Sequence, residues 1–325
     1  MDKRFALALV AVLGGCGNTG ALQSPVIPSA MESLNVGPSW MLPEAKSSDL
    51  VYASTFAGKV YVYSYPAGKL VGTLTVTGSP QGECVDKAGN IWVTDDIISG
   101  QQKILEYAHG GTSPIRTLTD GGGYFPEGCS VDPNTGDLAV VNVNTQCSSA
   151  PGGDFAIFTH AKGTPKIYTD PGLKCYGFVG YDDHSNLFVV GTQPLGLFQF
   201  AELPKGTSTF TNFVLNGGAS GGVEWNGKYI TFGDQIYNTV WQVKVTGSHA
   251  SFVGETGLFG LTDPTYQYAF AFDAKGRPNR VIALDIGNGG TIAVWKYPAG
   301  GSPTNIYPGS YYPSGVALSP GGKSQ

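Results

Sequence analysis

Apolar residues along the chain alternate with polar ones or run in short groups, and Gly, Pro, Asn and Asp separate these groups. Residues 59–63, Lys-Val-Tyr-Val-Tyr, show the alternation, and residues 90–93, Asn-Ile-Trp-Val, show a short apolar group. No stretch carries the period of an amphipathic helix. The pattern therefore predicts an all-β protein built from many short strands joined by tight turns.

The strand pattern itself repeats about every 45 residues. Residues 80–86 read Pro-Gln-Gly-Glu-Cys-Val-Asp and are followed by Gly-Asn-Ile-Trp-Val, and residues 126–132 read Pro-Glu-Gly-Cys-Ser-Val-Asp. Weaker copies begin near residues 178, 221 and 268, and the last begins at 313. Each copy supplies four strands, named a to d from the inside outward. Four short antiparallel strands per repeat are typical of β-propeller blades.

The two ends of the predicted domain complement each other. The domain begins with a b strand, residues 50–54, and finishes with an a strand, residues 315–319. A sheet between these strands would complete one blade and leave no open edge. We therefore predict a six-bladed β-propeller over residues 49–320, with four antiparallel strands per blade and a short tail at 321–325. Its last blade combines N-terminal strands b, c and d with the C-terminal strand a.

The repeat resembles that of NHL-type six-bladed propellers, whose units read Pro-x-Gly-Val-Ala-Val-Asp and then Gly-Asn-Ile-Tyr-Val. The resemblance covers about 270 residues, from Asp49 to Pro320. Tyr-Pro-Ala-Gly-Gly-Ser-Pro at 297–303 and Gly-Gly-Val-x-Trp-x-Gly-Lys-Tyr at 221–229 are similar to phrases of uncharacterised bacterial propeller lipoproteins. The resemblance implies the fold but no particular activity, because such propellers include hydrolases, lyases, sugar-binding proteins and interaction scaffolds.

The N-terminus has the pattern of an export signal. Lys3 and Arg4 precede an apolar run, residues 5–13, that is too short to span a bilayer, and the run ends in Leu-Gly-Gly-Cys. This ending resembles the bacterial lipobox. We therefore expect residues 1–15 to be a cleaved lipoprotein signal peptide and Cys16 to be lipidated. The alternative is an ordinary secretory leader with an incidental cysteine.

Composition changes this picture only in detail. Residues 16–48 are rich in Ser, Pro, Gly and Asn without a sustained pattern, which predicts a lipidated Cys16 followed by a flexible tether. The net charge is −5 and the bases are scattered singly, which argues against a nucleic-acid partner. We expect a monomer, exported to the bacterial cell envelope and held at the membrane through its lipid anchor.

The four remaining cysteines fit an exported chain with two disulfides, for which three pairings are possible. Cys84 and Cys129 lie in consecutive inner strands, one place out of step, so their side chains can face each other between blades. Cys147, in a b-to-c loop, and Cys175, entering the next blade, would pair likewise. We predict Cys84–Cys129 and Cys147–Cys175 disulfides, and the alternative is four free buried thiols.

No residue set predicts a catalytic centre. With strand a running downward, the d-to-a and b-to-c loops lie on one face, the top, and the a-to-b and c-to-d turns lie on the bottom. His109, His160, His184 and His249 all fall in bottom turns, away from the inner strands. The His-Glu-x-x-His and Cys-x-x-Cys motifs are absent from the sequence. We therefore predict no catalytic residues and no cofactor.

Carboxylates offer the alternative function, a divalent-metal-dependent hydrolase or lyase. Six-bladed lactonases of the gluconolactonase type hold a cation at the channel with Glu, Asn and Asp from different blades. Glu83, Glu224 and Asn142 are imaginable in such roles, and hard oxygen ligands suit Ca²⁺ or Mg²⁺. No spacing in this chain matches the motifs of that family, however, so no metal site is predicted.

Aromatic residues cluster in the predicted d-to-a loops around the top mouth of the channel. Loops on a rigid scaffold often carry recognition, and Tyr-rich surfaces bind sugars and peptides well. The alternative is that these residues cap the apolar ends of the blades. We predict a non-catalytic propeller that binds an unknown protein, peptide or glycan through its top-face loops. The candidate ligand-binding residues are Tyr124, Phe125, Tyr176, Tyr266, Tyr311, Tyr312, Glu83 and Glu127.

Overall fold

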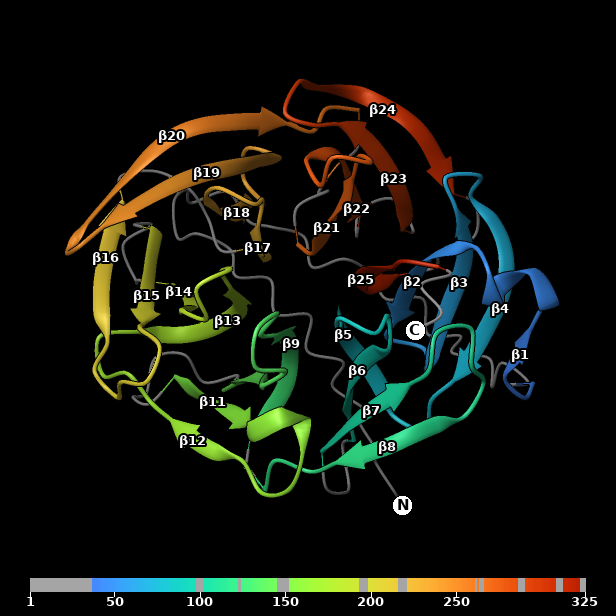
Figure 1. Ribbon diagram of the computed structural model, residues 1–325, viewed down its shortest axis with the longest axis horizontal. Coiled ribbons are helices and arrows are strands. Elements are labelled where there is room, and N and C mark those ends of the chain that lie inside the picture. The colour runs from blue at the N-terminus through green and yellow to red at the C-terminus, as the bar shows by residue number, and fades with distance from the viewer. Residues whose placement is uncertain are drawn as a thin grey trace, which may run out of the picture.

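The strands form six sheets arranged in a ring, each sheet pointing outward from a central axis (Figure 1). The computed structural model describes residues 37–97, 102–121, 124–144, 152–192, 198–215, 221–260, 262, 266–285, 290–307 and 312–321. Five sheets have four strands and the sixth has five. Neighbouring strands within each blade pair in antiparallel fashion. The chain is a six-bladed β-propeller, which confirms the fold predicted from the repeat.

Five blades are each built from four strands that are consecutive in the sequence, with the first strand innermost. Blade 2 contains β5 (Ser79–Val85), β6 (Ile91–Asp96), β7 (Lys103–Tyr107) and β8 (Pro114–Leu118). Blade 3 contains β9 (Phe125–Val131), β10 (Leu138–Val143), β11 (Gly153–Phe158) and β12 (Lys166–Tyr168). Blade 4 contains β13 (Lys174–Tyr181), β14 (Leu187–Thr192), β15 (Phe198–Leu203) and β16 (Thr211–Leu215). Blade 5 contains β17 (Val223–Trp225), β18 (Ile230–Asp234), β19 (Thr239–Thr246) and β20 (His249–Gly257). Blade 6 contains β21 (Tyr268–Phe272), β22 (Pro278–Asp285), β23 (Thr291–Lys296) and β24 (Gly300–Tyr307).

Blade 1 joins the two ends of the domain. Its inner strand is β25 (Pro313–Ser319), which pairs with β2 (Asp49–Thr55), and β3 (Lys59–Tyr65) and β4 (Lys69–Thr75) follow outward. The register runs from Leu50 opposite Ser319 to Ser54 opposite Gly315. Figure 1 shows the red β25 beside the blue β2. The predicted closure by a C-terminal strand is therefore confirmed.

The propeller begins earlier than the sequence indicated. A short strand, β1 (Trp40–Met41), pairs with the outer edge of β4, and the 3₁₀ turn η1 (Pro43–Lys46) leads from β1 into β2. The Met41 side chain fills the space that a Cβ atom at Gly72 would occupy. Residues 37–48 were assigned to the flexible tether, and for them that prediction is wrong. Two residues are too few to show a strand period, so the sequence carried no signal of β1.

The predicted signal peptide, Cys16 and the remainder of the tether lie outside the described residues, as do residues 322–325 of the predicted tail. Within the described part of the chain, no helix has the length and apolar character needed to cross a membrane.

The glycine of each repeat is explained by crowding at the axis. A Cβ atom at Gly82 in β5 would overlap the backbone carbonyl of Glu127 in the neighbouring β9. A Cβ atom at Gly315 in β25 would overlap the backbone carbonyl of Gln81. The inner strands are the parts of the blades that approach one another most closely, and only a residue without a side chain allows this approach.

In blades 2, 3 and 4, the Asp that follows the a strand has a structural role. One carboxyl oxygen of Asp86 accepts hydrogen bonds from the backbone N–H groups of Ala88 and Asn90, at 2.9 and 2.8 Å. Asp132 and Asp182 accept equivalent N–H bonds in the turns of blades 3 and 4. These Asx turns set the direction of strand b in these three blades.

Candidate functional site

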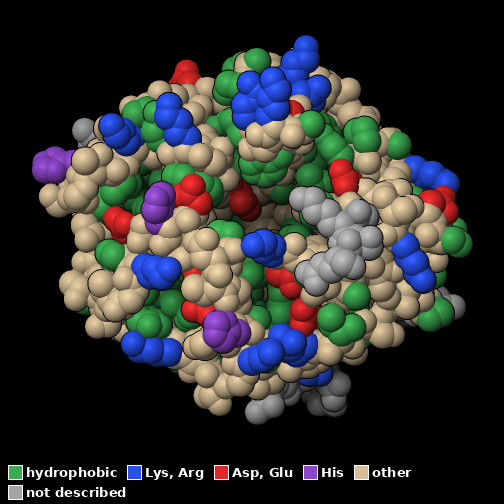
Figure 2. All heavy atoms as spheres, in the orientation of Figure 1, with side chains coloured by type: hydrophobic (Ala, Val, Ile, Leu, Met, Phe, Trp, Pro, Cys, Tyr) green, Lys and Arg blue, Asp and Glu red, His purple; other side chains and the backbone are tan. Residues whose placement is uncertain are grey.

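The inner strands of all six blades line one cavity on the propeller axis, here called the central channel. Its empty volume is about 260 Å³, part of which is open to solvent. Acidic side-chain atoms are visible deep in the hollow at the centre of the face shown in Figure 2. The lining includes Val316, Glu83, Gly128, Phe178, Glu224 and Gln267, one residue from each blade.

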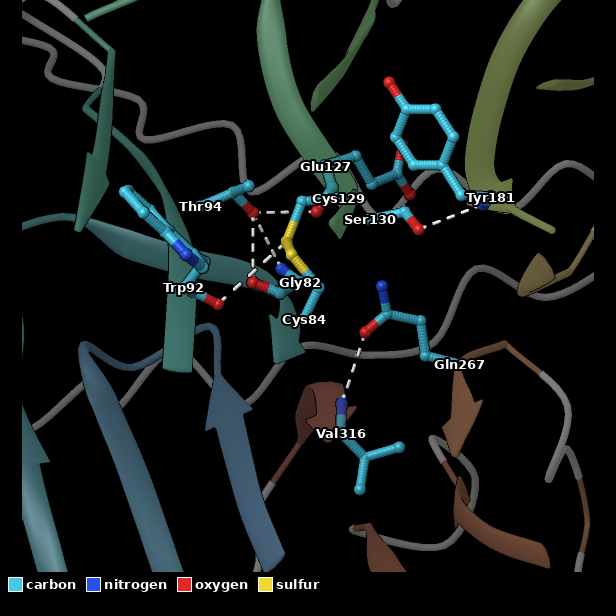
Figure 3. Close-up of a disulfide and its surroundings, with 10 residues drawn as sticks. All are labelled: Gly82, Cys84, Trp92, Thr94, Glu127, Cys129, Ser130, Tyr181, Gln267 and Val316. Atoms are coloured by element: carbon cyan, nitrogen blue, oxygen red, sulfur yellow. Dashed lines mark hydrogen bonds between the residues drawn. A yellow bond between two sulfur atoms is a disulfide. The ribbon is translucent and has the colours of Figure 1, made fainter. Parts of the chain in front are cut away.

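A disulfide ties two inner strands together beside the channel. Cys84 in β5 is bonded to Cys129 in β9, with 5.6 Å between their Cα atoms, which confirms the predicted pair (Figure 3). The Thr94 hydroxyl strengthens the same interface, because it donates to the carbonyl of Glu127 at 2.7 Å. Cys175 is also disulfide-bonded. Cys147 lies outside the described residues, so its pairing with Cys175 stays a prediction.

A hydrogen bond crosses the top of the channel. The Tyr266 hydroxyl, just before β21 in blade 6, donates to the carboxyl group of Glu127 in blade 3, on the opposite side of the ring (Figure 1). The Tyr266 ring packs edge-to-face on Phe178 of blade 4, with ring centroids 5.1 Å apart. Burial raises the pKa of Glu127 to about 7, and the Tyr266 bond opposes this rise. Side chains from three blades thus meet at this end of the channel.

Gln267 makes a second connection between blades at the channel. Its side-chain carbonyl accepts a hydrogen bond from the backbone N–H of Val316 at 3.2 Å, which joins blade 6 to the inner strand of blade 1 (Figure 3). Its amide nitrogen lies beside Gly82 of blade 2, where a Cβ atom would contact it. Tyr266 and Gln267 together therefore link blade 6 to blades 1, 2 and 3.

Glu83 is a buried carboxyl group on the channel wall. It is 5% exposed, and neither carboxyl oxygen has a hydrogen bond of good geometry within the described residues. Burial raises its pKa to about 8, although the nearby hydroxyl and N–H of Ser54 lower it in part. Burial likewise raises the pKa of Glu224, in β17, to about 8. At neutral pH both groups are mostly protonated, and so they add little negative charge to the channel.

The raised pKa of Glu83 makes stability depend on pH. Between pH 5 and 8 the folded state keeps a proton that Glu83 has lost in the unfolded chain, so the contribution of this group to stability falls as pH rises. We expect Glu83→Gln to unfold at a higher urea concentration than wild type at pH 8. The advantage over wild type should grow by at least about 1 kcal/mol between pH 5 and 8, since one pKa unit corresponds to about 1.4 kcal/mol.

Glu44→Gln is the control for this pH dependence. Glu44 is exposed, and its bond to Lys69 lowers its pKa, so it is ionised in both states throughout pH 5 to 8. Its substitution should leave the pH dependence of unfolding unchanged over that range. Equal slopes for wild type and Glu83→Gln would show that Glu83 is not a neutral, buried acid.

The carboxylates do not assemble the metal site that the alternative function requires. In the described ranges, the one set of three acidic, His or Cys side chains with ligand atoms within 4.8 Å of one another is Asp182, Asp183 and His184. These residues lie in the turn between β13 and β14, where Asp182 is buried and the other two are exposed, and none of them lines the channel. Asn142 instead donates from its side-chain amide to Asp154 at 2.7 Å. Glu83, Glu127 and Glu224 therefore share the channel region without sharing a coordination point.

Two of the aromatic candidates are not on an open surface, which contradicts their prediction as loop residues facing a ligand. Tyr176 is fully buried in β13, where its hydroxyl donates to the carbonyl of Asp170 at 2.9 Å. Tyr266 is 7% exposed and bonded to Glu127. For these two, packing between blades is the role that the structure shows. Tyr124 and Phe125 are half-buried, Tyr312 is 42% exposed, and Tyr311 lies outside the described residues.

An exposed apolar patch lies between blades 5 and 6 on the top side. We call it the blade 5–6 patch, and it consists of Ile236, Tyr237 and Phe259, which are 58%, 61% and 61% exposed. Ile236 and Tyr237 occupy the b-to-c turn of blade 5, and Phe259 follows β20. The sequence signal for this patch is a pair of adjacent apolar residues within a turn, in Gln235-Ile236-Tyr237-Asn238.

Hydrogen bonds hold the patch in one geometry. A carboxyl oxygen of Asp234 accepts from the N–H groups of Ile236 and Tyr237, at 2.9 and 3.1 Å. The next residue, Asn238, joins the turn to the strand end, because its carbonyl accepts from the N–H of Leu258 at 2.7 Å. The patch therefore presents large side chains on a fixed backbone, which reduces the entropy lost on binding.

His109, His160 and His184 lie in bottom turns, as predicted, whereas His249 is the first residue of β20, and none of the four lines the channel. His109 is half-buried, and its two ring nitrogens lie 2.6 Å from the Ser319 hydroxyl and 3.1 Å from the carbonyl of Ser48. Burial lowers the pKa of this ring. His109 thus links the end of β25 to the residue that precedes β2, the two strands that close blade 1. This role is structural.

Comparisons with known proteins identify the fold. No protein-family model matches the chain, and no protein with a curated description matches its sequence. A chain in the crystal structure of a nidogen/laminin complex superimposes with a TM-score of 0.59 at 14% identity, over 84% of this chain and 98% of that chain. A functionally unknown protein from Desulfotomaculum acetoxidans gives 0.58 at 10% identity, over 85% and 100%. The Cps50 (Swd1) β-propeller domain from Myceliophteria thermophila gives 0.54 at 10%, over 85% and 87%. Identities this low support the propeller architecture and no activity.

Proposed function

We propose that the protein is an exported, lipid-anchored propeller that binds a protein, peptide or glycan through its top-side loops without catalysis. The observation that carries this proposal is the blade 5–6 patch. Its three large side chains are more than half exposed, yet a buried Asp and backbone hydrogen bonds fix the turn that presents them. Apolar and aromatic side chains on a rigid frame are typical of binding surfaces. Tyr124, Phe125 and Tyr312 add aromatic surface on the same side of the ring.

The channel supports a scaffold role more than a catalytic one. Glu83, Glu127 and Glu224 are the acids that a hydrolase would use, but these three side chains do not converge on one point. The bond from Tyr266 also engages the Glu127 carboxyl group at the top of the channel. An enzyme of the gluconolactonase type requires converging oxygen ligands.

The N-terminal pattern supports attachment to the envelope. The apolar run that ends in Leu-Gly-Gly-Cys at residue 16 favours acylation of Cys16 after cleavage. Several acyl chains on one residue would hold the propeller stably at a membrane.

The binding role is tested by changing the blade 5–6 patch. The purified protein is screened against a glycan array and a peptide library, and every ligand found is tested again with Tyr237→Ser/Phe259→Ser. We expect this variant to lose at least tenfold in affinity, because two exposed aromatic anchors are removed. Ile115→Ser is the matched control, since Ile115 is 59% exposed on the outer strand of blade 2. Equal binding by wild type and the patch variant would contradict the proposal, and so would turnover of lactone or glycoside substrates that requires Ca²⁺ or Mg²⁺.

A further inference from the structure

We propose that the outer edge of blade 5 binds an extended peptide segment of a partner protein, in the way that blade 1 holds residues 39–42 of this chain. In blade 1 the strand β1 pairs with the outer edge of β4, which makes that sheet five-stranded (Figure 1). In blade 5 the outermost strand is β20, and no described strand pairs with its outer edge. This edge is separate from the blade 5–6 patch, so the inference goes beyond the function proposed above.

The strands β4 and β20 share a bulge at the same place. The register between β3 and β4 skips Val71, and Gly72 follows it. The register between β19 and β20 skips Val253, and Gly254 follows it, at the same distance from the start of the pairing. Among the other outer strands, β8 has Arg116 after its skipped residue, β12 and β16 pair without a shift, and the irregularity of β24 spans several residues. A bulged valine followed by glycine is therefore common to the edge that holds β1 and the edge of β20.

The bulge and the glycine of β4 are what allow β1 to approach. A Cβ atom at Gly72 would overlap the Met41 side chain and crowd the carbonyl of Trp40. The carbonyl of the bulged residue, Val71, accepts a hydrogen bond from the N–H of Leu42 at 2.7 Å. An outer strand that combines an outward carbonyl with a neighbouring glycine can thus receive a further backbone at close range.

The bulged valine of blade 5 lacks the cover that its counterpart in blade 1 has. Val71 is 0% exposed, and Leu42 packs against its apolar cluster, whereas Val253 is 44% exposed. The space over Gly254 is taken by the side-chain amide of Gln242 instead of a strand. A long, flexible side chain of this kind can turn to another rotamer at small cost. An uncovered apolar residue at an unpaired strand edge favours the addition of a strand.

The neighbouring residues define the side chains that the partner segment needs. The segment residue opposite Gly254 takes the place that Met41 has in blade 1, so a large apolar side chain fits there. The residue before it lies opposite Glu255, which is exposed and has no ion pair among the described residues. A Lys or Arg at that position would pair with Glu255 across the two strands.

The free edge is short, and its chemistry selects a peptide. Just beyond Glu255, a Cβ atom at Gly300 of blade 6 would overlap the carbonyl of Gly257, so blade 6 limits the pairing on that side. Backbone pairing requires a partner with its own row of N–H and C=O groups, which a polypeptide has and a glycan lacks. The expected partner is therefore a short extended segment in which a basic residue precedes a large apolar one.

The test uses a labelled synthetic peptide with the sequence of residues 37–43, the segment that covers the equivalent edge in blade 1. It is titrated with the chain from residue 16 onward, carrying Cys16→Ser. We expect saturable binding by fluorescence anisotropy and slower hydrogen exchange of the backbone amides of residues 252–255. A probe with Leu42→Pro lacks the N–H that bonds to the bulged valine, and it should bind at least about tenfold more weakly. Unchanged exchange of residues 252–255 at about 1 mM probe would overturn the proposal.

Substitutions in the protein provide the matched comparison. Val253→Lys should weaken the probe at least about tenfold, because it removes the apolar contact and places a charge on the edge. Val214→Lys is the control, since Val214 is 52% exposed on the outer strand of blade 4, and it should bind the probe as wild type does. Both variants should unfold in urea as wild type does. An equal loss of binding for both would contradict docking on β20.

A second probe tests the charge pairing, and the patch variant tests the location. A probe with Trp40→Arg should bind more tightly than the unchanged probe, and Glu255→Lys should remove this advantage. Tyr237→Ser/Phe259→Ser should bind both probes as wild type does. Loss of the probes in that variant, with normal binding by Val253→Lys, would place the peptide on the blade 5–6 patch. That outcome would overturn docking on β20 and leave the proposed binding function standing.

Discussion

Removing residues 313–325 should abolish the cooperative unfolding of the whole ring. The deletion takes away β25, the inner strand of blade 1, and exposes the edge of β2 from Leu50 to Ser54. It also removes the Ser314 hydroxyl, which donates to the carbonyl of Pro80 in blade 2 at 2.6 Å. An open strand edge promotes aggregation. We expect broad, non-cooperative unfolding followed by circular dichroism, and oligomers on size-exclusion chromatography.

A shorter deletion is the control for ring closure. Removing only residues 322–325 keeps β25 and the bond from the N–H of Gly321 to Asp49. This variant should unfold as wild type does. A monomeric, cooperatively unfolding protein that lacks residues 313–325 would mean that β25 does not hold the ring closed.

Replacing the inner-ring disulfide with Cys84→Ala/Cys129→Ala should lower the free energy of unfolding by about 4 kcal/mol. The bond closes a loop of 45 residues and joins the inner strands of blades 2 and 3, so its loss increases the entropy of the unfolded chain and loosens one blade interface. The measurement is the midpoint of urea unfolding without reductant. The double substitution leaves no unpaired thiol at the site.

Reductant separates this disulfide from the one that contains Cys175. Adding dithiothreitol to the double variant reports on the bond of Cys175 alone, because Cys84 and Cys129 are gone. Wild type in reductant should be at least as destabilised as the double variant. An unchanged midpoint for the double variant would show that the bond adds no stability to the ring.

Much of the fold could be predicted because the signals that specify a blade are local. The Asp of the repeat acts within a few residues, since Asp86 organises its own turn. Gly82 permits contact with the inner strand of the next copy. The offset between Cys84 and Cys129 follows from the alternation of side chains along two neighbouring inner strands. Each of these features can be read from one copy of the repeat or from two consecutive copies, without coordinates.

The candidate site was harder to predict because its contacts join distant copies of the repeat. Tyr266 and Glu127 are separated by about half of the ring, and nothing near either residue indicates the other. Tyr176 has the sequence context of a loop aromatic, yet it is buried among neighbouring strands. The blade 5–6 patch depends on the turn after Asp234 meeting the chain after β20, a contact that the repeat period does not encode.

The sequence by itself determined the number of blades, the order of strands within each and the way the ends join. These follow from short-range alternation and turn chemistry, in which the interacting residues are neighbours along the chain. The tertiary structure alone decided which residues meet across the axis and which aromatics remain exposed. Ring closure brings strands that are far apart in the sequence to one axis, so Tyr266 and Glu127 come into contact although 139 positions separate them.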